Sequence, residues 1–166
     1  MEKALNAQIN AEFWSAYLDL SMSVHFCAKG MKGVANWFAV QFKEEQDHAQ
    51  IFVDYVLARG GRVTLAPIAE VPCEWESPLA AFEATLVHEK KVTAMIDALC
   101  RQAEADKDFA TANKLVWFVD EQVEEEQNAQ DIIDSLKMVD DSKMGLYMID
   151  KELAARVYTA PSIAGA

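Results

Sequence analysis

One polar pattern occurs twice in this sequence, and the second copy lies 77 residues after the first. Each copy has a glutamate, then a Glu or Gln 33 residues later, then a His or Glu three residues after that. The members are Glu12, Glu45 and His48 in the first copy and Glu89, Gln122 and Glu125 in the second. Positions three apart project from the same face of a helix. The repeat therefore predicts two helix pairs of one design, each with polar groups on its inner face.

Apolar residues flank these polar positions at helical spacing, which is typical of helices that pack in a core. We expect four long helices, at about residues 3–29, 34–59, 78–105 and 109–137. Short turns join the first helix to the second and the third to the fourth, so each pair should run antiparallel. Residues equidistant from a turn then lie at one level, which places Glu12 opposite Glu45 and Glu89 opposite Gln122.

The segment of about residues 60–76 contains Pro67 and Pro72 and shows no helical pattern. At about 3.3 Å per residue it can run the full length of a bundle. We therefore expect a crossover that makes the second and third helices parallel. Ser77 followed by Pro78 indicates a helix N-cap with proline in the first turn.

A short amphipathic helix is expected at about residues 146–155, separated from the preceding chain by Gly145. The tail at residues 161–166 shows no regular pattern and should be loose. The expected fold is all-α: a four-helix bundle of about residues 3–137 in up-down-down-up order, with a short C-terminal fifth helix. We expect residues 1–166 to form a single domain.

The formal net charge of −12 restricts the partners of the chain. It disfavours nucleic acid and anionic membranes and favours metal cations, although solubility alone explains it equally well. No apolar run approaches the roughly 18 residues of a membrane span, and the polar N-terminus does not resemble a signal peptide. The three cysteines are widely spaced and lack a C-x-x-C pair. They indicate reduced thiols, and we expect a cytoplasmic protein.

Acids on a buried stripe cost several kcal/mol unless they are paired or bind a metal. Carboxylates with one imidazole suit hard to borderline divalent ions such as iron or manganese. Four carboxylates would neutralise two divalent ions, which predicts a dinuclear site. The alternative is a set of solvated acids on imperfect stripes, and the shared offset of the two copies disfavours it. The predicted ligands are Glu12, Glu45, His48, Glu89, Gln122 and Glu125.

Four stretches of the sequence resemble bacterial non-haem ferritins, a family whose inward Glu and Glu-x-x-His helices are known to hold two irons. The first-helix stretch is E-F-W-S-A-Y-L at residues 12–18, followed by L-S-M-S at 20–23. The second helix has E-E-x-x-H at 44–48, and the fourth has D-E-Q-V-E-E-E at 120–126. The stretch G-L-Y-M-I-D-K-E-L at 145–153 resembles the family's C-terminal helix.

The resemblance implies a hollow shell of 24 chains that takes up Fe(II), oxidises it with O2 or peroxide and stores Fe(III) mineral. Glu12, Glu45 and His48 would hold the first iron, with Glu45 bridging. Glu89 and Glu125 would hold the second iron, and Gln122 would contact water or bound oxygen species. A third iron is implied beside this pair, although a solvated acidic face is the simpler interpretation of its ligands. Those residues are Glu44, Glu121, Glu124 and Glu125.

The fourth helix has Glu125 where bacterioferritins and rubrerythrins repeat a histidine, so the chain is more similar to the non-haem ferritins. Asp19 stands where ferritins usually carry a tyrosine, seven residues after Glu12. This carboxylate could hold or pass on iron, or it could only accept hydrogen bonds. Trp117 is a candidate electron donor, although a core aromatic is the simpler interpretation. The other functions considered are a cage that stores metal without fast oxidation and a di-metal oxidase that forms no cage.

Overall fold

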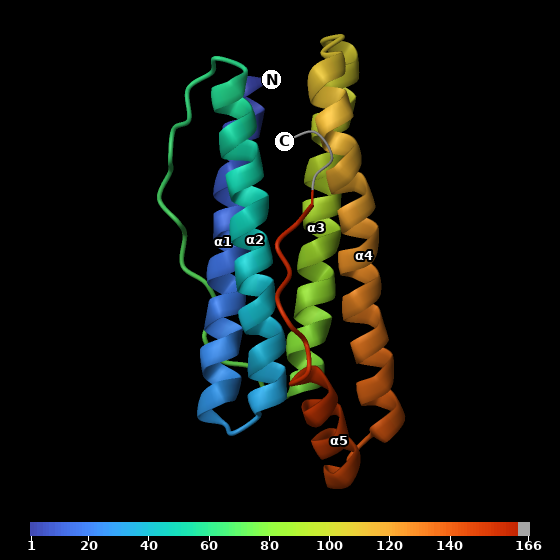
Figure 1. Ribbon diagram of the computed structural model, residues 1–166. Helices are drawn as coiled ribbons and strands as arrows, with labels where there is room; N and C mark the ends of the chain where they lie inside the picture. Colours follow the sequence, from blue (N-terminus) through green and yellow to red (C-terminus); the bar gives the residue numbers. More distant parts are fainter. Residues whose placement is uncertain (163–166) are drawn as a thin grey trace.

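The computed structural model describes residues 1–162, which form five α-helices and no strand (Figure 1). The helices are α1 (Glu2–Ala28), α2 (Lys32–Ala58), α3 (Pro78–Ala105), α4 (Phe109–Val139) and α5 (Lys143–Leu153). The first four lie side by side, with α1 against α2 and α3 against α4, while α5 lies at one end. Helices α2 and α3 run parallel, since the segment between them returns along the outside of α1 and α2. The predicted four-helix bundle with its crossover and short fifth helix is confirmed.

Two apolar clusters fill the interior of the bundle at different heights. One is built around Phe26, Phe38 and Phe82, and the other around Phe52 and Phe118, whose rings stack with centroids 4.0 Å apart. Each fully buried phenylalanine stabilises the fold by roughly 1.5–3 kcal/mol. The buried polar side chains of the repeated pattern lie between these clusters, because each long helix places apolar residues before and after its polar positions.

Capping side chains fix where the helices of the second pair begin. The hydroxyl of Ser77 accepts a hydrogen bond from the backbone N–H of Ala80 at 3.1 Å, and Pro78 occupies the first turn of α3. This confirms the predicted N-cap. Asp108 caps α4 in the same way, by accepting from the N–H of Thr111 at 3.2 Å. Each such cap is worth about 1 kcal/mol.

The crossover is extended, and side chains of α1 hold it by bonding to its backbone. Asn6 accepts from the N–H of Thr64 at 2.6 Å and donates to the carbonyl oxygen of Arg62 at 3.0 Å. Further along, Ser21 donates to the carbonyl oxygen of Pro72 at 2.7 Å. These bonds satisfy backbone groups that have no partner in a helix or sheet.

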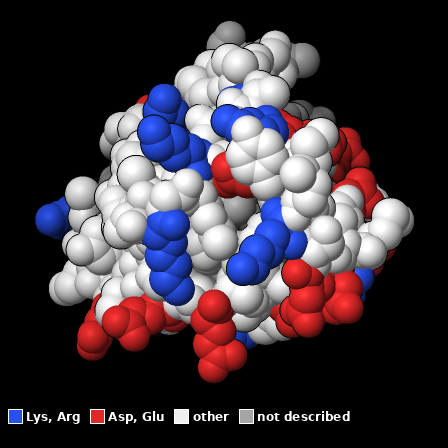
Figure 2. Space-filling view, turned by 90° about the horizontal axis from the view of Figure 1, so that it is seen from below, with Lys and Arg blue, Asp and Glu red and all other residues white. Residues whose placement is uncertain are grey.

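The fifth helix begins earlier than the sequence pattern predicts. Gly145 was expected to precede it, but the helix starts at Lys143 and includes Gly145, because the hydroxyl of Ser142 accepts from the N–H of Gly145 and caps the first turn. The expected start at residue 146 and end near 155 are therefore wrong by a few residues. The end of the molecule where α5 lies is mostly uncharged, with separate lysine and arginine side chains on its face and acidic side chains mainly along its edges (Figure 2).

Helix α5 is attached to the bundle through the start of α2. The side chain of Met31 provides no cap for α2. Instead, Oδ1 of Asp150 accepts from the N–H groups of Gly33 and Val34 at 2.8 and 3.0 Å. A Cβ atom at position 33 would lie 1.5 Å from the carbonyl oxygen of Asp150, so only glycine permits this approach. Asp150 thus caps one helix from another, and its charge also suits the positive end of the helix dipole.

After α5, the chain turns back and runs as an extended segment alongside α2 (Figure 1). The tail was predicted to be loose from residue 161. Residues 161 and 162 have no regular secondary structure, and residues 163–166 lie outside the described part of the chain. No helix among residues 1–162 combines the length and the apolar character that a membrane crossing requires.

Candidate metal centre

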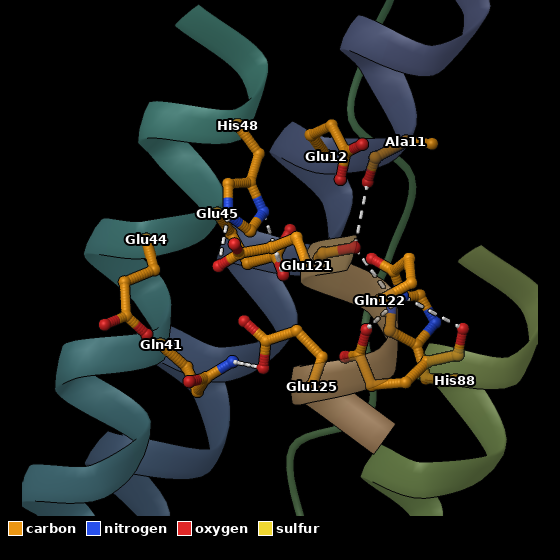
Figure 3. Close-up of polar contacts among 12 residues, drawn as sticks. Ala11, Glu12, Gln41, Glu44, Glu45, His48, His88, Glu121, Gln122 and Glu125 are labelled. Carbon is orange, nitrogen blue, oxygen red and sulfur yellow. Dashed lines mark hydrogen bonds and ion pairs between the residues drawn. The ribbon is translucent and has the colours of Figure 1, made fainter. Parts of the chain in front are cut away.

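The polar residues of the repeated pattern meet at one level in the middle of the bundle, where side chains from α1, α2, α3 and α4 point toward one another (Figure 3). None of the six is more than 5% exposed. Burying so many ionisable groups is costly unless they share protons or bind cations. The six residues are Glu12, Glu45, His48, Glu89, Gln122 and Glu125.

The first helix pair supplies a compact group of three ligands. Glu12, Glu45 and His48 each place one ligand atom within 4.8 Å of the others. Nδ1 of His48 lies 3.7 Å from Oε1 of Glu45. One oxygen of Glu12 accepts from the amide of Gln8 at 2.8 Å. The other oxygen of Glu12 and one oxygen of Glu45 are buried without a hydrogen-bond partner. A divalent cation between the three side chains would satisfy both oxygens, so this donor set fits iron.

The second helix pair adds ligands on the other side of His48. Oε1 of Glu121 lies 3.7 Å from Nε2 of His48, and these two residues form a second group with Glu125, again within 4.8 Å. Glu89 lies outside both groups and accepts a hydrogen bond from Nε2 of Gln122 at 3.3 Å. The geometry thus groups Glu125 with Glu121 and His48 rather than with Glu89, and it places Gln122 beside Glu89 as expected.

Burial dominates the titration of the carboxyl groups. It raises the pKa of Glu12 and of Glu45 above the ordinary value, and the positive charge of His48 only partly offsets this. Burial, reinforced by the charge of Glu125, raises the pKa of Glu89 to about 8. Burial likewise raises the pKa of Glu125 to about 7. Glu89 therefore keeps its proton at neutral pH, and a bound cation would displace it.

The pKa of His48 is raised, whereas burial alone would lower the pKa of an imidazole. Burial opposes its charged form, but the carboxylates of Glu121 and Glu45 raise its pKa well above the ordinary value. The ring also contacts Trp117 edge to face, with ring centroids 5.5 Å apart. Trp117 is partly buried and packs against the apolar cluster around Phe118. This position agrees with the interpretation of Trp117 as a core aromatic, and electron donation by Trp117 stays a prediction.

The additional residues implied for a third iron lie in three different environments. Glu44 is partly buried and forms an ion pair with Arg156, with Nη2 and Oε2 2.6 Å apart. Glu121 faces His48, whereas Glu124 is exposed.

Asp19 is buried, as its place on the inward stripe predicts. Burial, reinforced by the negative charges of Glu89 and Glu125, raises the pKa of Asp19 well above the ordinary value.

The sequence patterns did not identify three polar residues that contact the ligands. Gln8 and Gln41 are buried and donate to Glu12 and Glu125, respectively. Each lies four residues before a glutamate of the pattern, so helical spacing could have identified both. Arg156 lies beyond the last helix, where no periodicity indicates its place.

Comparisons with known proteins agree with this fold and donor set. The model of the family described as Ferritin, ferritin-like domain, matches residues 2–139. A bacterial non-heme ferritin of Bacteroides fragilis is 44% identical over 156 residues, which cover 94% of this chain and 97% of that protein. One from Staphylococcus epidermidis is 38% identical over 93% of both chains. The crystal structure of an open pore ferritin from Archaeoglobus fulgidus superimposes with a TM-score of 0.94 at 51% identity, covering 95% of this chain and 97% of that one.

A four-helix bundle with buried carboxylate and histidine ligands defines the ferritin-like class of proteins. The chain belongs to the ferritin family, and its function is iron storage.

Proposed function

We propose that this ferritin oxidises Fe(II) at a dinuclear centre in the middle of each bundle. One observation carries the proposal: Glu12 and Glu45 each have a buried oxygen without a hydrogen-bond partner, and both belong to the group completed by His48. Such oxygens are destabilising in a folded protein unless a cation binds them. Iron is the substrate here, so a site that is unfavourable when empty and favourable when loaded suits capture from solution.

In this proposal Glu12, Glu45 and His48 bind the first Fe(II). Glu125 and Glu89 bind the second, with Glu45 reaching either ion and Gln122 orienting Glu89 through the hydrogen bond described above. Two Fe(II) ions together deliver two electrons to one O2, which with two protons yields peroxide and two Fe(III). Anionic oxygen ligands stabilise Fe(III) more than Fe(II), because the harder and more highly charged ion gains more from them. The carboxyl groups release their protons when iron binds.

We further propose that the chain assembles into a hollow shell of about 24 copies in which Fe(III) mineral accumulates. The ferritin relatives support this, and so does a mineral's need for an enclosed space. Sedimentation of the purified protein at neutral pH should give one large closed particle. A stable monomer or dimer under those conditions would contradict storage in a shell.

Oxygen uptake after anaerobic loading with Fe(II) tests the oxidation step. Glu12→Gln and Glu45→Gln should each slow the first seconds of uptake by at least tenfold, because each removes an anionic ligand while keeping the side chain's shape. The matched control is Glu104→Gln, which alters an exposed glutamate of α3 and should leave uptake unchanged. Slow uptake in wild type together with normal iron loading would instead favour a cage that stores iron without fast oxidation.

A further inference from the structure

The segment that follows α5, residues 154–162, is held against α2 by specific contacts at Arg156 and Tyr158; we name it the C-terminal strap. The side-chain amide of Asn36 donates to the carbonyl oxygens of Leu153 and Arg156 at 3.2 and 2.9 Å. Further along, the hydroxyl of Tyr158 donates to the carboxylate of Asp47. These contacts hold the strap at the level of the metal centre, because Asn36 and Asp47 lie on either side of Glu44 and Glu45 in α2.

Arg156 directs its side chain from the strap toward the centre. Its Nη2 donates to Oε2 of Glu44 at 2.6 Å and to Oε1 of Gln41 at 2.5 Å. The guanidinium also lies over the ring of Trp37, 4.6 Å from its centroid. The Arg156 side chain is 22% exposed and that of Glu44 is 20% exposed, so water screens this ion pair only in part. A planar guanidinium held by two acceptors and an aromatic ring has a fixed position.

Gln41 transmits this position to a proposed iron ligand. It is fully buried, and its Nε2 donates to Oε2 of Glu125 at 2.8 Å. Because Arg156 can only donate, the oxygen of Gln41 must face Arg156 and its NH2 group must face Glu125. One oxygen of Glu125 is thereby occupied, and the other is left to face His48 and Glu121 (Figure 3).

We propose that Arg156 is a positioning residue and a built-in counterion of the metal centre. It orients Glu125 through Gln41, and its guanidinium takes the place of a third metal cation at Glu44, so the centre holds two divalent ions while the strap is docked. This inference rests on the proposed dinuclear centre. The physical reason is charge: the negative charges of Glu121 and Glu124 act on Glu44 and favour a cation beside it. The guanidinium of Arg156, 2.6 Å from Oε2 of Glu44, already supplies that positive charge and repels a further ion.

Counting bound ions tests the proposal without relying on iron oxidation. The metal-free, assembled full chain is dialysed anaerobically against Co(II), which is not oxidised under these conditions, and bound cobalt is measured per chain. Wild type should bind two ions. Arg156→Gln should bind a third ion at least about tenfold more tightly than wild type. In wild type that ion would lie beside the guanidinium of Arg156, and two adjacent positive charges cost more free energy than a tenfold change in affinity represents.

Three further variants separate counterion from packing effects. Arg156→Lys keeps a positive charge on the strap and should still bind two ions. Glu44→Gln combined with Arg156→Gln removes the carboxylate as well, so the count should return to two. Arg101→Gln is the matched control, since Arg101 is exposed and pairs only at 3.9 Å with Asp97; it should behave as wild type.

The outcomes distinguish this inference from the proposed function. Equal cobalt counts and affinities in wild type and Arg156→Gln, or three tightly held ions in wild type, would overturn the role of Arg156 and leave the dinuclear centre standing. No bound cobalt in wild type would overturn the dinuclear centre itself, and the inference with it.

Discussion

The buried carboxyl group of Glu89 should destabilise the metal-free protein at neutral pH. Its pKa is about 8 in the folded chain, compared with 4.5 for an ordinary glutamate. The folded state therefore binds more protons than the unfolded state between these values, and stability is lost as the pH rises through this window. At 1.36 kcal/mol per pKa unit, the loss reaches about 3 kcal/mol at pH 7 and is under about 1 kcal/mol at pH 5.

Replacing Glu89 by glutamine removes this titration and keeps the shape of the side chain. The new amide oxygen can still accept from Nε2 of Gln122, which lies 3.3 Å from Oε2 of Glu89 in wild type. After allowing for the cost of burying an amide, we expect a gain of about 1–3 kcal/mol at pH 7. For a chain of this length, that corresponds to a rise in Tm of roughly 2–12 °C.

Calorimetry of the metal-free protein at pH 5, 6, 7 and 8, at one chain concentration, measures this effect. The difference in Tm between Glu89→Gln and wild type should grow with pH, whereas Glu104→Gln should track wild type throughout. A Tm difference that is the same at pH 5 and pH 8 would refute the reasoning. Saturating Co(II) should reverse the order, because wild type alone retains the carboxylate proposed to bind the second ion.

Three other substitutions test different parts of the molecule. His48→Ala should abolish oxygen uptake in the first seconds after Fe(II) addition, because both ligand groups share this imidazole, while sedimentation shows an unchanged particle; unaltered uptake would place the chemistry elsewhere. Gly33→Ala should lower stability by about 1–3 kcal/mol or more and expose α5 to amide hydrogen exchange, since the added methyl overlaps the backbone of Asp150; an unchanged Tm would contradict this. Asp19→Asn should slow either iron oxidation or the later rounds in which the site is refilled. Stopped-flow absorbance measures both rates, and progress curves identical to wild type over several iron additions would show that Asp19 is purely structural.

The level at which the polar residues meet could be predicted because it depends on local geometry. Helical spacing fixes which side chains face inward, and the short turns fix which residues lie opposite one another. Glu12 and Glu45 are buried together for this reason, as are Glu89 and Gln122. Neither step requires knowledge of contacts between distant segments.

The attachment of α5 and of the C-terminal strap could not be predicted in this way. Asp150 caps a helix 117 residues earlier in the chain, and Arg156 pairs with a glutamate 112 residues earlier. A lone Asp in an amphipathic helix and a lone Arg in a segment without periodicity carry no sign of a distant partner. Only the folded backbone brings them to Gly33 and Glu44. The start of α5 was predicted too late for a simpler reason. Glycine usually marks the end of a helix or a turn, so Gly145 was placed before α5, whereas Ser142 caps the helix ahead of it.

The metal centre and the apolar core are coupled through their opposite effects on stability. The metal-free chain must keep Glu12 and Glu45 buried with unpartnered oxygens, and the phenylalanine clusters above and below offset that cost. The repulsion among the neighbouring carboxylates is a separate cost: a proton on Glu89 lowers it at neutral pH, and in our proposal Arg156 lowers it permanently at Glu44. Each of these positive charges competes with a metal ion for the carboxylate that it neutralises. A proton leaves readily when a cation arrives, so a protonated carboxyl group can still load iron. A tethered guanidinium does not leave, so Glu44 should stay closed to iron.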